Sequence, residues 1–122
     1  MSQGIDHIDI AVDDVEATAA FFRAFGYGEV KRSEHAGLSI ELRLPDDNQP
    51  VIELTTTRKP NGKTVPAGLR HIAFRSSDIK ATQASLVEKG VTLEGDPKMI
   101  NGRMLMNAMD PAGGVSLQVV ET

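Results

Sequence analysis

The sequence contains an internal repeat with an offset of 64 residues, and this repeat limits the folds open to the chain. The segment from residue 7 to 30 aligns without a gap with residues 71 to 94, and seven of the 24 aligned pairs are identical. The identical pairs are His7/His71, Ile8/Ile72, Asp14/Asp78, Ala17/Ala81, Thr18/Thr82, Ala20/Ala84 and Gly26/Gly90. This period is longer than that of solenoid repeats. The chain is therefore predicted to be one domain made of two copies of one module, at about residues 1–60 and 65–122.

Both copies show the same order of predicted elements. Residues 5–12 and 69–76 are β-rich alternating segments and are predicted as strands. A helix follows each strand, with an acidic or hydroxyl N-cap before it and a glycine at its end. The predicted caps are Asp13 or Asp14 and Ser77 or Asp78, and the stops are Gly26 and Gly90. Three further strands follow each helix, at about 28–35, 38–44 and 50–57, and at 91–100, 103–109 and 115–121. Each module is therefore predicted as βαβββ, and the fold class as α+β.

Two aromatic and histidine features have simple structural interpretations. Phe21, Phe22 and Phe25 lie at helical spacing, which predicts that they pack into the core beneath the first helix. His35 lies outside the repeat and is predicted to be an exposed turn residue. Residues 58–66 are polar and contain proline and glycine, so they are predicted to form the loop between the modules.

Alternation along the strands separates an apolar face, which covers the helices, from a polar face. The polar face carries His7, Asp9, Ser39, Glu41, Arg43, Glu53, His71, Arg75, Arg103, Asn107 and Gln118. A simple solvent-facing sheet would be expected to carry mainly Lys, Thr and Glu. Instead, this face holds two of the three histidines of the chain, at equivalent places in the repeat. Modules placed edge to edge would gather these side chains in one cleft.

Four residues of this face form a plausible donor set for a divalent metal. His7 and His71 offer imidazoles, Glu53 a carboxylate and Gln118 an amide oxygen. Such a mixed set suits Ni, Co, Mn, Fe or Zn and would leave a Lewis acid with open positions. The alternative is that each histidine is an ordinary surface residue. Pattern alone leaves both interpretations open.

Composition removes several other classes of function. The formal net charge is −4, so the basic excess typical of nucleic-acid and membrane-surface binding is absent. The chain has no Cys, which excludes disulfides and thiolate catalysis. No apolar run approaches the roughly 20 residues of a membrane span. The expected location is the cytoplasm, and no nucleic-acid or membrane partner is expected.

The sequence resembles the vicinal oxygen chelate superfamily, which includes glyoxalase I, methylmalonyl-CoA epimerase, extradiol dioxygenases and bleomycin-binding proteins. The resemblance covers nearly the whole chain. The segments that carry it are residues 4–14, Phe21-Phe22 before Gly26, residues 51–54, residues 69–74 and residues 110–118. It implies paired βαβββ modules, a homodimer, and metal ligands on the first and last strands of each module. Carried over residue by residue, these ligands are His7, Glu53, His71 and Gln118.

The sequence departs from the family at two positions. The final ligand is a glutamate in most of these enzymes, and here it is Gln118. This resembles the epimerase arrangement with the modules exchanged, and it leaves Glu53 as the carboxylate of the set and the candidate base. The glutathione-anchoring arginine of the lyases falls on Ala11, whereas its repeat partner is Arg75. Specific recognition of glutathione is therefore not expected.

Three functions remain open from the sequence. The first is a metal-dependent isomerase or lyase, like glyoxalase or the epimerase, that removes a proton next to a carbonyl group of a small chelating substrate. In that hypothesis Arg43, Arg75, Arg103, Asn107 and Glu41 contact the substrate, and the arginines face an anionic tail. The second is a metal-free binding protein of the bleomycin-resistance type. The third is a regulatory domain whose cleft binds an unrelated ligand.

Overall fold

The computed structural model describes residues 4–34 and 36–122, so the prediction for His35 lies outside the described residues. The chain forms two compact units. Of the described residues, the N-terminal unit takes those from His7 to Arg70, and the C-terminal unit takes residues 4–6 and His71–Thr122. Among the described residues, no helix has the length and apolar character needed to cross a bilayer.

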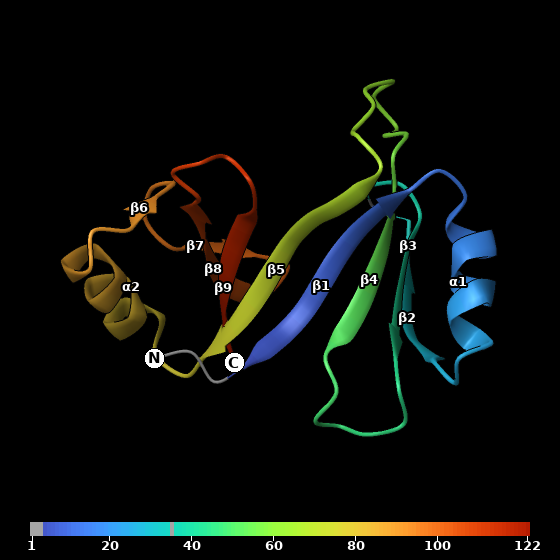
Figure 1. Cartoon of the computed structure of the whole chain (residues 1–122), viewed down its shortest axis with the longest axis horizontal. Helices are drawn as coiled ribbons and strands as arrows, with labels where there is room; N and C mark the ends of the chain where they lie inside the picture. The colour runs from blue at the N-terminus through green and yellow to red at the C-terminus, as the bar shows by residue number, and fades with distance from the viewer. Residues whose placement is uncertain (1–3, 35) are drawn as a thin grey trace. The chain divides into compact units, whose positions relative to one another are not determined.

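The N-terminal unit has the predicted βαβββ order (Figure 1). Its elements are β1 (Ile5–Val12), α1 (Val15–Arg23), β2 (Gly28–Ser33), β3 (Ser39–Arg43) and β4 (Val51–Thr56). The strand order is β2-β3-β4-β1, with β1 and β4 parallel and the other pairs antiparallel. The helix covers one face of this sheet, which leaves the opposite face free of helices.

Alternation along the strands explains how this unit packs. Ile40, Leu42 and Leu54 project from β3 and β4 toward α1 and are completely buried. The helix contributes Val15 and Ala19 to the same core. Residues of the opposite parity, including Glu41 and Glu53, therefore lie on the helix-free face.

The C-terminal unit repeats this plan with one difference. Its elements are β5 (Gly68–Ser76), α2 (Ile79–Glu88), β6 (Thr92–Leu93), β7 (Lys98–Ile100), β8 (Arg103–Met109) and β9 (Ser116–Glu121). The strand order is β5-β9-β8-β6, with β7 also paired to β8. Ile79 of α2 packs against Met106 and Val119 of the sheet, as in the first unit.

The single strand predicted at residues 91–100 is wrong, because the segment forms two short strands, β6 and β7. Gly95 between them has a positive φ of 82°, a conformation that interrupts an extended chain. Pro97 lacks the N–H group that a continuous ladder would use. Both short strands still pair with β8, so the segment keeps its predicted place in the sheet.

The prediction that all three phenylalanines of α1 are core residues is correct only for Phe22, which packs against the core. Phe21 and Phe25 are 64% and 67% exposed. They lie one helical turn apart and contact each other edge to face, with ring centroids 5.3 Å apart. The face of α1 that packs against the sheet is narrow, because Val15 and Ala19 are its buried residues and Phe22 is partly buried beside them.

The N-caps explain why both helices begin where they do. The Asp14 side chain accepts a hydrogen bond from the Ala17 N–H at 3.0 Å, and Asp78 does the same for Ala81 at 3.1 Å. We expect Asp14→Ala to lower the free energy of unfolding by about 1 kcal/mol, because it leaves an N–H of the first turn without this acceptor. Urea unfolding of the variant would measure the loss. Glu88→Ala, at the exposed end of α2, is the control, and an equal loss there would contradict the capping role.

Candidate metal and proton-transfer site

Strand register places three carboxylates side by side on the helix-free face of the N-terminal unit. Asp9 of β1 pairs with Glu53 of β4, and Glu53 pairs in turn with Glu41 of β3. His7 lies two residues before Asp9 and therefore shares this face. We call the row Asp9–Glu53–Glu41, which has His7 beside it, the acidic row.

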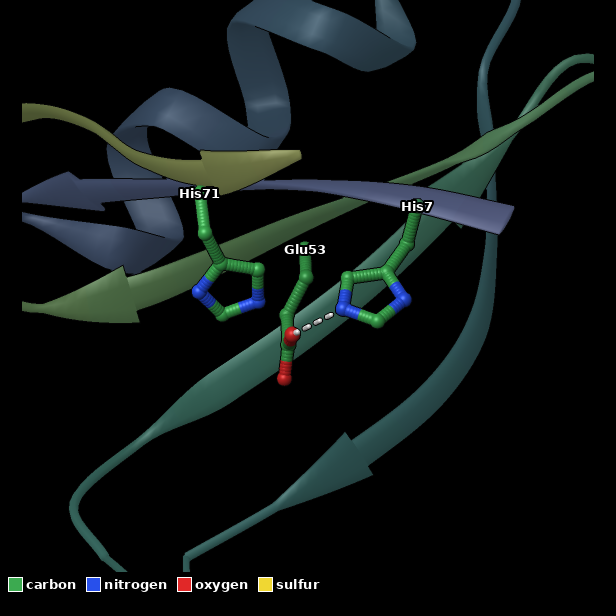
Figure 2. Close-up of side chains that lie close together, drawn as sticks. All are labelled: His7, Glu53 and His71. Carbon is green, nitrogen blue, oxygen red and sulfur yellow. Dashed lines mark ion pairs between the residues drawn. The ribbon is translucent and has the colours of Figure 1, made fainter. Parts of the chain in front are cut away.

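The Glu53 side chain lies between a histidine and a serine. Its Oε1 atom is 3.8 Å from Nε2 of His7, and its Oε2 atom accepts a hydrogen bond from the Ser39 hydroxyl at 3.2 Å. Figure 2 shows the carboxylate and the His7 imidazole turned toward each other. The two side chains are only 15% (His7) and 27% (Glu53) exposed. Both side chains are therefore largely shielded from bulk water.

The pKa of Glu53 is raised above its usual value of 4.5. Burial is the largest cause, since it disfavours the charged form, and the negative charge of Asp9 is the next. Glu41 adds to the increase, whereas His7 and the Ser39 hydrogen bond oppose it. A carboxylate in this position is stabilised when it binds a proton or when a cation lies beside it.

This raised pKa has a consequence for stability. A proton binds Glu53 more tightly in the folded protein than in the unfolded chain, so its contribution to stability is present below pH 4.5 and is lost as the pH rises through the folded pKa. We therefore expect Glu53→Gln to be more stable than the wild type at neutral pH in the presence of a chelator. The difference should shrink as the pH falls toward the unfolded pKa. Urea unfolding over this pH range measures it, and a pH-independent difference would show that the gain does not come from the raised pKa of Glu53.

Asp9 is held in place by its own partners. It is 4% exposed, and its Oδ1 atom accepts a hydrogen bond from the Thr55 hydroxyl at 2.9 Å. The Arg70 guanidinium lies 3.9 Å from its other oxygen. Side-chain parity predicts Asp9 on the polar face, whereas the sequence analysis does not identify Thr55 and Arg70 as its partners. Thr55 could have been found by parity, because it lies two residues after Glu53 on the same strand.

The C-terminal unit repeats the register of the N-terminal unit with neutral side chains. Ala73 of β5 pairs with Gln118 of β9, and Gln118 pairs with Asn107 of β8. His71 precedes Ala73 by two residues, as His7 precedes Asp9. The equivalent of the acidic row is therefore Ala73–Gln118–Asn107. In this row the Gln118 amide nitrogen donates to the Asn107 side-chain oxygen at 3.2 Å.

The arginines predicted to contact substrate already have carboxylate partners. Arg103 forms two hydrogen bonds to Asp6, at 3.0 and 3.2 Å, and Arg75 lies 3.6 Å from the same carboxylate. This cluster of two arginines and one aspartate retains one net positive charge. Arg43 pairs with the fully exposed Asp47 at 3.2 Å, an ion pair open to solvent.

The chemistry of the donor atoms fits a divalent metal. His7, Glu53 and His71 each offer one ligand atom, these atoms lie within 4.8 Å of one another, and all three residues are half-buried (Figure 2). Two imidazoles and a carboxylate are ligands that first-row transition metals accept readily. A cation here would also relieve the unfavourable charge of Glu53.

The family of the chain follows from its sequence match. The model of the Glyoxalase/Bleomycin resistance protein/Dioxygenase superfamily matches residues 4–119. The chain belongs to this superfamily. The resemblance inferred from the two modules is thereby confirmed, together with the α+β fold class. No curated protein matches the chain at a significant level.

Solved structures of methylmalonyl-CoA epimerases share the fold of this superfamily member. One is 24% identical, with a TM-score of 0.81 and coverage of 99% of this chain and 96% of that one. A variant of the Streptomyces coelicolor epimerase in complex with 2-nitronate-propionyl-CoA is also 24% identical, with a TM-score of 0.76 and coverage of 100% and 99%. The Mycobacterium tuberculosis epimerase is 22% identical, with a TM-score of 0.77 and coverage of 98% and 88%.

Proposed function

We propose that the protein is a metal-dependent isomerase or lyase that removes a proton next to a carbonyl group of a small chelating substrate. The observation that carries this proposal is the half-buried Glu53 carboxylate, which lies beside His7 and has a raised pKa. Burial and the neighbouring Asp9 raise the pKa of this carboxylate in the metal-free protein, so it binds a proton more readily than an exposed glutamate does. Membership of the superfamily supports the same assignment.

We assign the metal to His7, Glu53, His71 and Gln118. The residue types suit Ni, Co, Mn, Fe or Zn, and the choice among these is left to experiment. When bound, the metal supplies a Lewis acid that stabilises negative charge on a substrate oxygen. The chain itself supplies the shielded face on which the substrate carbonyl is oriented.

The proton-transfer role falls to the N-terminal unit. Glu53 is the candidate base, because it accepts the proton that leaves the α-carbon. Glu41 is its cross-strand neighbour and is placed to contact the substrate or to exchange that proton onward. Among the described residues, the corresponding row of the C-terminal unit carries no carboxylate, since its members are Ala73, Gln118 and Asn107.

An anionic thioester is the substrate class that we would test first. The cluster of Arg75, Arg103 and Asp6 retains a positive charge that suits a carboxylate or phosphate group. Arg43 is assigned to a further substrate contact, as its place on the polar face predicts. The epimerase structures with a propionyl-CoA analogue add weight to 2-substituted acyl-CoA thioesters. Methylglyoxal–thiol adducts are the second class.

Exchange of the α-proton in heavy water tests this proposal. The protein is stripped with a chelator, reloaded separately with each of the five metals, and incubated with the two substrate classes while NMR follows loss of the α-proton signal. We expect metal-dependent exchange with at least one pair of metal and substrate. Metal binding without exchange would remove the proton-transfer role. Tight binding of a small organic ligand to a protein that binds no metal would favour the bleomycin-resistance type of function.

We further propose that the protein is a cytoplasmic homodimer, as the family resemblance implies. Light scattering coupled to size-exclusion chromatography would give a mass near twice 13.1 kDa. A mass equal to one chain at micromolar concentration would contradict the dimer. Fractionation of the source cells would test the location.

A further inference from the structure

We propose that Asn107 is a positioning residue that orients the Gln118 side chain so that its carbonyl oxygen is available to a metal. The inference rests on the proposed metal site and goes beyond it, because it assigns a residue that does not touch the metal. It also replaces substrate contact as the role of Asn107. The observation behind it is the hydrogen bond from the Gln118 amide nitrogen to the Asn107 side-chain oxygen.

An amide ligand has an orientation problem that a carboxylate does not have. Only the oxygen of the Gln118 amide can bind a cation, because the NH₂ group is a donor with no lone pair to offer. A half-turn about the last side-chain torsion exchanges the two ends and would present NH₂ in place of oxygen. An acceptor beside the nitrogen therefore favours the orientation that leaves the oxygen free.

A comparison of the two units shows that an amide ligand and a carboxylate ligand have different hydrogen-bonding neighbours. Asn107 and Glu41 occupy the same register position, each directly opposite the last-strand ligand of its unit. Glu53 needs no such orientation, because both ends of a carboxylate are oxygen atoms. Its hydrogen-bonding neighbour is instead a donor, the Ser39 hydroxyl. Gln118, by contrast, lies opposite a side chain that accepts from its nitrogen.

The backbone fixes the position of Asn107 as well. Asn107 lies inside β8, where it pairs with Gln118 on one side. Its backbone carbonyl accepts a hydrogen bond from the Glu94 N–H at 2.9 Å, just beyond β6 on the other side. Both Asn107 and Gln118 are half-buried, so water competes only partly for their mutual bond. The Asn107 side-chain oxygen is thus held within hydrogen-bonding distance of the Gln118 amide nitrogen.

Metal affinity tests the inference without any assay of activity. Chelator-stripped protein is titrated with Co²⁺, and the dissociation constant and the visible absorption bands of the bound ion are recorded for the wild type, five test variants and one control variant. The variants are N107A, N107D, Q118A, N107A/Q118A and H7A, with M109A on the same strand and face as the control. Thermal unfolding of each variant checks that it is folded.

We expect N107A to weaken Co²⁺ binding by about 10- to 100-fold, the range typical for loss of a partner that orients a ligand. N107D should bind at least as tightly as the wild type, because its carboxylate accepts the same hydrogen bond. The double variant should bind no more weakly than Q118A, since Asn107 acts through Gln118. M109A should match the wild type.

Several outcomes would overturn the inference. The role of Asn107 would be excluded if N107A binds Co²⁺ with wild-type affinity while H7A loses Co²⁺ binding. That result would leave the proposed metal site intact. Independent, additive losses for N107A and Q118A would place Asn107 in a different role, as would an effect of N107A on substrate KM alone. Failure of the wild type itself to bind Co²⁺ would remove the metal site and, with it, the role of Asn107.

Discussion

His7→Ala is expected to abolish tight binding of a divalent metal. The substitution removes one imidazole from a set in which His7, Glu53 and His71 lie within 4.8 Å of one another. It also removes the group that partly offsets the negative charge around Glu53. The loss should exceed the roughly 10- to 100-fold effect of removing a residue that only orients a ligand. Elemental analysis after dialysis and calorimetric titration with Ni²⁺, Co²⁺, Mn²⁺ and Zn²⁺ would measure it.

The chain offers a matched control for this experiment. His35 is the third histidine of the sequence and lies outside the repeat. His35→Ala should retain wild-type metal content, because the proposed donor set does not include it. Equal metal content in the wild type and His7→Ala would exclude His7 as a ligand. A loss in both variants would point to nonspecific binding by histidines.

Glu53→Gln is expected to have the largest effect on proton transfer. The amide keeps the size of the side chain and an oxygen donor, but it cannot accept the substrate proton as a base. The α-proton exchange rate at saturating metal should fall by about 10²- to 10⁴-fold, the contribution typical of a positioned general base. The measurement is the NMR assay of α-proton exchange in heavy water, with metal content determined for every sample.

Two comparisons separate the chemical role of Glu53 from a structural one. The expected gain in stability of Glu53→Gln at neutral pH would show that the variant folds, so that a slow rate cannot be attributed to unfolding. Glu41→Gln changes the neighbouring carboxylate of the acidic row and should reduce the rate less. Exchange by Glu53→Gln at the wild-type rate would exclude Glu53 as the base.

Much of the fold was predictable because the repeat and the alternation of side chains are local signals. The seven identical pairs located both modules, and the acidic N-caps located both helices. Parity alone put His7, Glu53, His71 and Gln118 on the helix-free face. Register then follows from the need to bury the other face, since a shift by one residue would reverse both faces.

The remaining features depend on contacts that a linear pattern does not encode. The exposure of Phe21 and Phe25 depends on how much of α1 the sheet can cover, and the spacing of apolar residues does not reveal this. The pairing of Asp6 with Arg75 and Arg103 joins residues as far as 97 positions apart. The bond between Gln118 and Asn107 requires the exact pairing of β8 and β9, which a predicted strand does not specify.

The equal register of the two units has an evolutionary and engineering consequence. Each unit offers one imidazole and one oxygen-bearing side chain from corresponding strand positions. One substitution in each unit is therefore enough to move the carboxylate from one half of the chain to the other. One order of these two substitutions passes through a form with a carboxylate in both halves, and the other order passes through a form with a carboxylate in neither half. The paired exchange Glu53→Gln and Gln118→Glu reproduces such a step, because it conserves total charge and donor types while transferring the base to the other half of the duplicated chain.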